Sequence, residues 1–180
     1  VNWVQRATVR NWSSVAVSNN GSYFVATVAG GKIYTSSGGS SWTEKGSDQN
    51  WRTIACDSTC TRMIAGVTDG TLYTSSDTGT TWTSRNSSAL WRQVSSSSTG
   101  QYLMAVAFGS PIAYSSDYGV NWSNKTSSFN FTSGAISQDG TKLFATIIDS
   151  GTITSTNSGS SWTALGTKQS WGAAGISGDG

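Results

Sequence analysis

Apolar side chains recur in short runs that repeat along the chain with a 40-residue period. In every repeat one run is more apolar than its neighbours and is bounded by turn sequences that contain Gly, Asn or Asp. A continuous apolar run of this length is typical of a strand that is buried on both faces, as between stacked sheets. No window has the period of an amphipathic helix. The runs are Tyr23–Ala29, Met63–Val67, Tyr102–Phe108 and Leu143–Ile148.

Each repeat contains four strand-like runs that are separated by tight turns. Because such a unit returns with a 40-residue period, the sequence predicts an all-β fold, a β-propeller of four-stranded antiparallel blades. Residues 1–180 are interpreted as a single domain with four complete blades at about 12–46, 51–86, 91–126 and 131–166. In the second repeat the predicted strands are Trp51–Asp57, Thr61–Thr68, Gly70–Ser76 and Thr81–Asn86.

The two ends of the chain each match part of a further blade. Residues 1–6 resemble the last strand of a preceding blade, and residues 171–177 resemble the first strand of a following one. The two middle strands of that blade are absent. Three explanations stay open, namely a fragment of a longer array, an incomplete ring, or a protomer that a neighbour completes. Because an unpaired strand edge favours association, we expect a fragment or a protomer in an assembly.

An eight-residue pattern follows the third strand of every repeat. Within it the Asp77 carboxylate can accept hydrogen bonds from nearby backbone N–H groups, and Gly79 can adopt a positive φ. The closing Trp82 is large enough to wedge between neighbouring sheets. The pattern therefore predicts a tight turn. Its copies are Thr35–Trp42, Ser75–Trp82, Ser115–Trp122 and Ser155–Trp162.

This octet resembles the Asp-box, or BNR repeat, with its S/T-x-D-x-G-x-x-W pattern. That family includes sialidases, sortilin-type receptors, xyloglucan-degrading enzymes and a photosystem assembly factor, all built as β-propellers. The resemblance implies a propeller fold and a structural hairpin away from the ligand site. Ser37 and Asn157 depart from the Asp, so no metal role is expected at that position. The matching residues are Ser75, Asp77, Gly79, Trp82, Ser115, Asp117, Gly119, Trp122, Asn157, Gly159, Trp162, Gly39 and Trp42.

Charge and composition exclude several functions. Charged residues are 11% of the chain and the net charge is +2, which argues against a nucleic-acid partner. No apolar run approaches the roughly 18 residues that a membrane span requires. The chain has no His, and Glu44 is its only Glu, so Ser/His and Cys/His triads and a zinc site are excluded. We therefore expect no catalytic residue, no cofactor and no metal.

Arginine and aspartate residues that a glycosidase could use have simpler interpretations. Arg52 and Arg92 occupy the same repeat position, just after a Trp, which favours an arginine that lies on the strand surface or stacks on the Trp. Asp69 and Asp149 stand before a Gly or Ser-Gly at equivalent turns, which favours turn formation over acid–base chemistry.

Cys56 and Cys60 flank a predicted hairpin tip. They can form a small disulfide, worth about 2 kcal/mol for so short a loop, and a pair of free thiols is the alternative. Six Asn residues begin N-x-S/T sequons, which adds to the case for a secreted or cell-surface protein. Asn20 is expected on a turn, whereas Asn11 and Asn130 are expected to be less accessible. The sequons start at Asn11, Asn20, Asn86, Asn121, Asn124 and Asn130.

Two functional hypotheses survive. The first is a non-enzymatic extracellular scaffold that binds protein partners or associates with itself through unpaired terminal strands. The second is carbohydrate binding, by a lectin-like propeller or a fragment of an Asp-box glycosidase. Tyr118 and Tyr114 are the candidate ligand contacts. Tyr118 is the sharper of the two because it replaces a small residue inside a turn and should be exposed.

Overall fold

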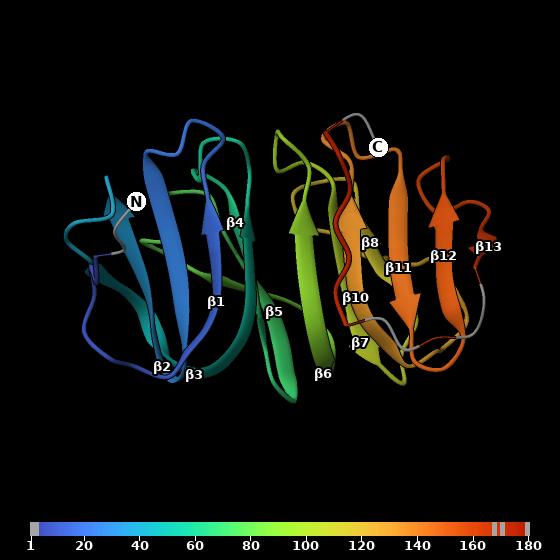
Figure 1. Ribbon diagram of the computed structural model, residues 1–180, viewed down its shortest axis with the longest axis horizontal. Helices are drawn as coiled ribbons and strands as arrows, with labels where there is room; N and C mark the ends of the chain where they lie inside the picture. Colours follow the sequence, from blue (N-terminus) through green and yellow to red (C-terminus); the bar gives the residue numbers. More distant parts are fainter. Residues whose placement is uncertain (1–3, 167–168, 170–171, 179–180) are drawn as a thin grey trace.

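A computed structural model describes residues 4–166, 169 and 172–178 (Figure 1). The described residues form strands, turns and extended segments but no helix, and therefore no helix that could cross a membrane. All strand pairings are antiparallel, which confirms the predicted all-β class. The strands are β1 (Trp12–Val17), β2 (Tyr23–Ser37), β3 (Thr43–Cys56), β4 (Met63–Val67), β5 (Gly70–Ser75), β6 (Thr83–Ser96), β7 (Leu103–Phe108), β8 (Ala113–Ser115), β9 (Ser123–Asn124), β10 (Phe131–Ile136), β11 (Leu143–Ile147), β12 (Gly151–Ser155) and β13 (Thr163–Leu165).

Consecutive strands pair except β9 and β10, and the pairings divide into four sheets (Figure 1). The first sheet contains β1, β2 and the beginning of β3. The second contains the end of β3 with β4, β5 and the beginning of β6, and the third continues from β6 to β9. The fourth contains β10 to β13. β3 and β6 therefore belong to two sheets each and join the first three into one continuous strand order.

Three strands, β2, β3 and β6, are longer than the sequence pattern suggests. β2 doubles back on itself, because the Gly38 N–H donates to the Ser22 carbonyl oxygen at 2.7 Å and Gly30 at its centre has a φ of 73°. β3 continues where a break was expected between 46 and 51. Its polar residues Gln49 and Asn50 pair with the middle of β2, so backbone pairing extends the strand through a segment without apolar side chains.

Apolar clusters fill the spaces between successive sheets. Between the first and second sheets, Val25 and Ile33 pack with Trp51, Ile54 and Met63. Similar clusters lie between the second and third sheets and between the third and fourth. Alternate residues of a central strand enter different clusters, as Met63 and Ile64 of β4 do, because neighbouring side chains point to opposite faces. Each inner sheet is thus buried on both faces.

Hydrogen bonds also join the first strands of successive repeats. In each case a side chain in one sheet accepts from a backbone N–H that lies one repeat later. This regular contact fixes how far each sheet is displaced from its neighbour. The pairs are Ile54 N–H to Ser14 Oγ (3.2 Å), Val94 N–H to Thr53 Oγ1 (3.1 Å), Gly134 N–H to Gln93 Oε1 (3.3 Å) and Ala174 N–H to Ser133 Oγ (2.6 Å).

The predicted terminal strands fall partly outside the described residues, which exclude 1–3 and 171. Residues 4–6 and 172–177 are described and are not strands. No described strand is paired with either segment in a sheet. The segment 172–178 nevertheless follows β10 (Figure 1), where the Gln138 N–H donates to the Gly178 carbonyl oxygen at 3.0 Å.

Candidate functional site

The octet that ends at Trp82 forms a turn that is closed by side-chain hydrogen bonds. The Asp77 carboxylate accepts from the Ser75 hydroxyl (2.8 Å), the Thr81 N–H (2.8 Å) and the Thr81 hydroxyl (2.6 Å). The Trp82 indole N–H donates to the Gly79 carbonyl oxygen at 2.9 Å. These bonds, with those to Thr81 the strongest, lower the pKa of Asp77 to about 2. The carboxylate is therefore ionised and occupied by the turn.

The later copies of the octet form the same turn. Asp117 accepts from Asn121 N–H (2.8 Å) and Asn121 Nδ2 (2.6 Å), and these bonds lower its pKa as well. Asn157 accepts from the Ser161 N–H at 2.9 Å. In the first copy, Gly38 and Gly39 both have positive φ where the other turns have one Gly. In the second, third and fourth sheets the side chains at this position are therefore engaged in closing the turn.

The first sheet has an uncovered face. Val15 of β1 is 66% exposed, whereas Ile54 and Val94, at the equivalent positions of the second and third sheets, are 4% and 3% exposed. Val17 is also exposed, and Trp12 is only half-buried although the equivalent Trp51 is fully buried. The difference arises because no described sheet precedes β1. The face thus presents apolar residues that the other sheets bury.

Trp42 differs from the other box tryptophans in its hydrogen bonding. The Trp82 and Trp122 indole N–H groups donate within their own turns, to the Gly79 and Gly119 carbonyl oxygens at 2.9 Å, and the Trp162 indole N–H donates to the Lys125 carbonyl oxygen of the preceding sheet at 2.9 Å. The buried Trp42 indole N–H has no partner among the described residues. An unsatisfied buried donor costs free energy.

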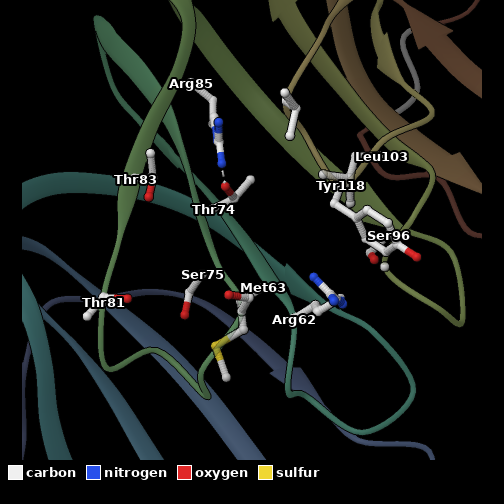
Figure 2. A pocket seen from close by; sticks show the side chains of 13 residues that line it. Arg62, Met63, Thr74, Ser75, Thr81, Thr83, Arg85, Ser96, Leu103 and Tyr118 are labelled. Atoms are coloured by element: carbon white, nitrogen blue, oxygen red, sulfur yellow. Dashed lines mark hydrogen bonds between the residues drawn. The ribbon is translucent and has the colours of Figure 1, made fainter.

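A pocket of about 240 Å³ lies between the second and third sheets. Arg62 enters it from the turn before β4, and Arg85 enters it from β6 (Figure 2). Tyr118 closes the side that belongs to the third sheet. Hydroxyl groups make up much of the remaining wall, from Thr74, Ser75, Ser76, Thr81, Thr83 and Ser96. Met63, Leu103 and Val120 also line it, so the pocket combines polar and apolar surface with two cationic side chains.

Both arginines are held in place by neighbours without charge. The Arg62 guanidinium lies 4.2 Å from the centre of the Tyr118 ring, a cation–π contact, and Arg85 Nε donates to Thr74 Oγ1 at 3.0 Å (Figure 2). Neither forms an ion pair with a described residue, and no Asp or Glu lines the pocket. The arrangement suits an anionic ligand.

The equivalent basic residues of the neighbouring sheets are used differently. Lys45, one repeat before Arg85, bridges to the second sheet by donating to Thr80 Oγ1 at 3.1 Å. Lys125, one repeat after it, lies against Gly159 and places its ammonium group 4.9 Å from the centre of the Tyr114 ring. The column of basic residues is thus periodic, but only Arg85 points into a pocket of this kind among the described residues.

The two predicted ligand tyrosines have different environments. Tyr118 is 40% exposed and has a φ of 64°, an unfavourable backbone conformation for a bulky residue. Tyr114 is 5% exposed, and its hydroxyl donates to the Gly140 carbonyl oxygen at 3.2 Å. Only Tyr118 is therefore in a position to contact a ligand.

Cys56 and Cys60 are joined by a disulfide at the turn between β3 and β4. All six sequon asparagines are exposed, including Asn11 and Asn130, which were expected to be less accessible. Both lie just outside the strands that begin with the aromatic residues, so the burial of those rings does not extend to them. The described residues contain no cluster of His, Cys, Asp or Glu that could hold a metal ion.

Sequence reasoning did not find the Arg62–Arg85 pair. The two residues are 23 positions apart and in different elements, and only the folding of the second sheet brings them to one pocket. The signal that could have found them is the repeat column Lys45, Arg85 and Lys125, in which the middle residue differs.

No protein-family model matches this chain, and no curated protein sequence matches it. Solved structures do. YCF48 from Cyanidioschyzon merolae has a TM-score of 0.71 at 14% identity, over 98% of this chain and 63% of that chain. YCF48 bound to D1 peptide has a TM-score of 0.63 at 19% identity, over 93% and 56%. A GH74 enzyme from Niastella koreensis has a TM-score of 0.65 at 19% identity, over 85% and 23%.

These structures are β-propellers, and their similarity supports a propeller fold for this chain. The identities are too low to carry more than the fold. This chain spans less than two thirds of each of them.

Proposed function

We propose that this chain is a non-enzymatic interaction scaffold of four Asp-box propeller blades with a 40-residue period, and that it binds a protein partner on the uncovered face of its first sheet. The supporting observation is Val15. Its counterparts Ile54 and Val94 are buried by the preceding sheet, so the face has the composition of an internal interface but lacks the covering sheet.

The partner that fits this face is a β-sheet of the same kind, supplied by a second copy of the chain. Inside the chain, the face toward the preceding sheet packs against residues such as Val25 and Ile33. On the fourth sheet the equivalent place is already taken by segment 172–178, because the Ala174 N–H bonds to Ser133 Oγ as the Ile54 N–H bonds to Ser14 Oγ. Two copies would therefore join through their first sheets, at the end of the structure away from the fourth sheet (Figure 1).

Light scattering during size-exclusion chromatography tests this scaffold function. We expect the wild type to form dimers or larger species as its concentration rises, and Val15→Asp to remain monomeric because a charge on this face cannot be buried without a partner. Val120→Asp is the matched control, since Val120 is also exposed but lies on the turn between β8 and β9. A wild type that stays monomeric at every concentration would overturn the proposal.

Three other observations support this proposal. The absence of His and the single Glu leave few groups for catalysis, and Glu44 accepts a hydrogen bond from the Tyr34 hydroxyl at 3.0 Å. The YCF48 structure with a D1 peptide is a propeller that binds a protein segment. The disulfide supports a location in an oxidising compartment, such as outside the cell.

Carbohydrate binding is the second candidate function, and the pocket between the second and third sheets favours it. An exposed aromatic ring and a wall of hydroxyl groups are present there. We expect a glycan array to show saturable binding that Tyr118→Ala abolishes. Silence across the array would remove this candidate and leave the scaffold function.

A further inference from the structure

We infer that the pocket between the second and third sheets binds an acidic sugar, that is, a saccharide with a sulfate or carboxylate group. This inference deepens the carbohydrate-binding proposal by naming the ligand class. Arg62 and Arg85 contact the charged group in this account, and Tyr118 contacts the sugar ring.

The charge of the pocket carries the first step. Arg62 and Arg85 are both half-buried, and burying a cation is costly unless an anion or strong hydrogen-bond acceptors compensate it. The nearest box carboxylate, Asp77, does not line the pocket, and its oxygens already accept from Ser75 and Thr81. An anionic ligand would supply the missing compensation.

The orientation of the two side chains carries the second step. The Arg85 bond to Thr74 uses only Nε, which leaves both terminal nitrogens as donors. The Arg62 guanidinium faces the Tyr118 ring, so the N–H groups at its edge remain available. A planar guanidinium can donate two parallel hydrogen bonds to a carboxylate or sulfate, so each of the two side chains retains donors for such a group.

The surrounding residues favour a sugar over an extended peptide. A peptide that adds to a sheet requires a free strand edge, whereas β5 and β7 beside the pocket are paired on both sides. The hydroxyls of Thr83 and Ser76 can exchange hydrogen bonds with sugar hydroxyls. The volume of about 240 Å³ suits a single charged sugar unit rather than a larger ligand.

NMR titration of the arginine side-chain Nε–H signals tests the inference on the whole chain. The probes are glucuronic acid, galactose 6-sulfate, neutral galactose and a short Glu-rich peptide, all at constant ionic strength. We expect the signals of Arg62 and Arg85 to shift with one or both acidic sugars and not with galactose. Comparing the two acidic sugars tells which oxyanion the pocket prefers.

Charge-removing variants provide the second measurement. We expect Arg62→Gln and Arg85→Gln each to weaken binding of the better acidic sugar by about fivefold or more, from the loss of a charge-assisted hydrogen bond. Arg52→Gln is the matched control, because it removes the same charge from an exposed position outside this pocket. Its affinity should stay within about twofold of the wild type.

The outcomes separate this inference from the function on which it rests. Equal weakening in all three variants would show non-specific charge attraction and overturn the inference. Stronger binding of galactose than of either acidic sugar would overturn the anionic assignment while carbohydrate binding stands. Binding of the Glu-rich peptide alone would overturn both and assign the pocket to an acidic protein segment.

Discussion

The uncovered face of the first sheet and the covered face of the second sheet are built from equivalent residues in different surroundings. Val15 and Val17 in the first sheet correspond to Ile54 and Cys56 in the second. In the second sheet these positions enter the cluster with Val25, and the Ile54 N–H is bonded to Ser14. In the first sheet the same positions face solvent.

The comparison shows that burial here depends on a residue's neighbours and not only on its type. A repeat supplies one face to the sheet before it and another to the sheet after it, so stability arises at the interfaces between repeats. The outer face of the first described sheet has apolar residues like those of the inner faces, so it is suited to a partner.

The largest expected difference is between alanine variants of Ile54 and of its equivalent Val15. We expect Ile54→Ala to reduce the free energy of unfolding by about 3 kcal/mol, because it leaves a cavity between two sheets. Val15→Ala in the monomer should change it by less than about 0.5 kcal/mol. Urea denaturation at low protein concentration measures both. Similar losses for the two variants would mean that the face of the first sheet is buried in the monomer.

Replacing the disulfide should have the next largest effect. The double variant Cys56→Val, Cys60→Gly gives the second sheet the residues that the first sheet has at these positions, Val17 and Gly21. We expect a loss of about 2 kcal/mol, from greater freedom of the unfolded chain. Urea denaturation of the oxidised wild type is the reference. No change in the midpoint would show that the bridge does not stabilise this sheet.

The two indole groups should differ by a smaller amount. Trp162→Phe removes a hydrogen bond to the preceding sheet and should cost about 1 kcal/mol more than Trp42→Phe, whose indole N–H has no partner to lose. Thermal denaturation of the pair measures the difference. If Trp42→Phe were the more destabilising of the two, its indole would have an important contact in solution.

The smallest expected effect is a pH dependence of the free energy of unfolding that comes from Asp77 and is absent from the turn with Asn157 at the same position. The folded-state pKa of Asp77 is lowered to about 2, below the unfolded value of about 3.9. Its contribution is therefore present above pH 4 and is lost as the pH falls from about 4 to about 2. Asp77→Asn places at this position the residue found at Asn157. We expect this variant to lose less stability than the wild type between about pH 4 and about pH 2, and the difference should be below about 1 kcal/mol because the carboxylate is solvent-accessible. Asp139 titrates in the same window and should preserve the remainder.

The periodic features of the fold could be predicted from the sequence. Each apolar run lies on a central strand, as Met63–Val67 does in β4, because burial on both faces leaves an unbroken apolar signature. The joined strands β3 and β6 could not be predicted, since backbone hydrogen bonds hold their polar central residues and leave no side-chain pattern.

The candidate site was predictable only in part. Tyr118 could be predicted, because a bulky side chain at a tight-turn position usually filled by a small residue is expected to point into solvent. Arg62 and Arg85 did not, because their position depends on contacts with Tyr118 and Thr74 that no local pattern encodes. The exposure of Val15 could not be predicted either, because Val is a common strand residue whether or not another sheet covers it.

Cysteine trapping tests the scaffold most directly. A Val15→Cys chain is oxidised under mild conditions, with a Val120→Cys chain as the control. Because copies that join through their first sheets bring their two Val15 side chains together, we predict a disulfide-linked dimer of Val15→Cys and none of the control. Absence of that dimer, or equal trapping by the control, would contradict the account.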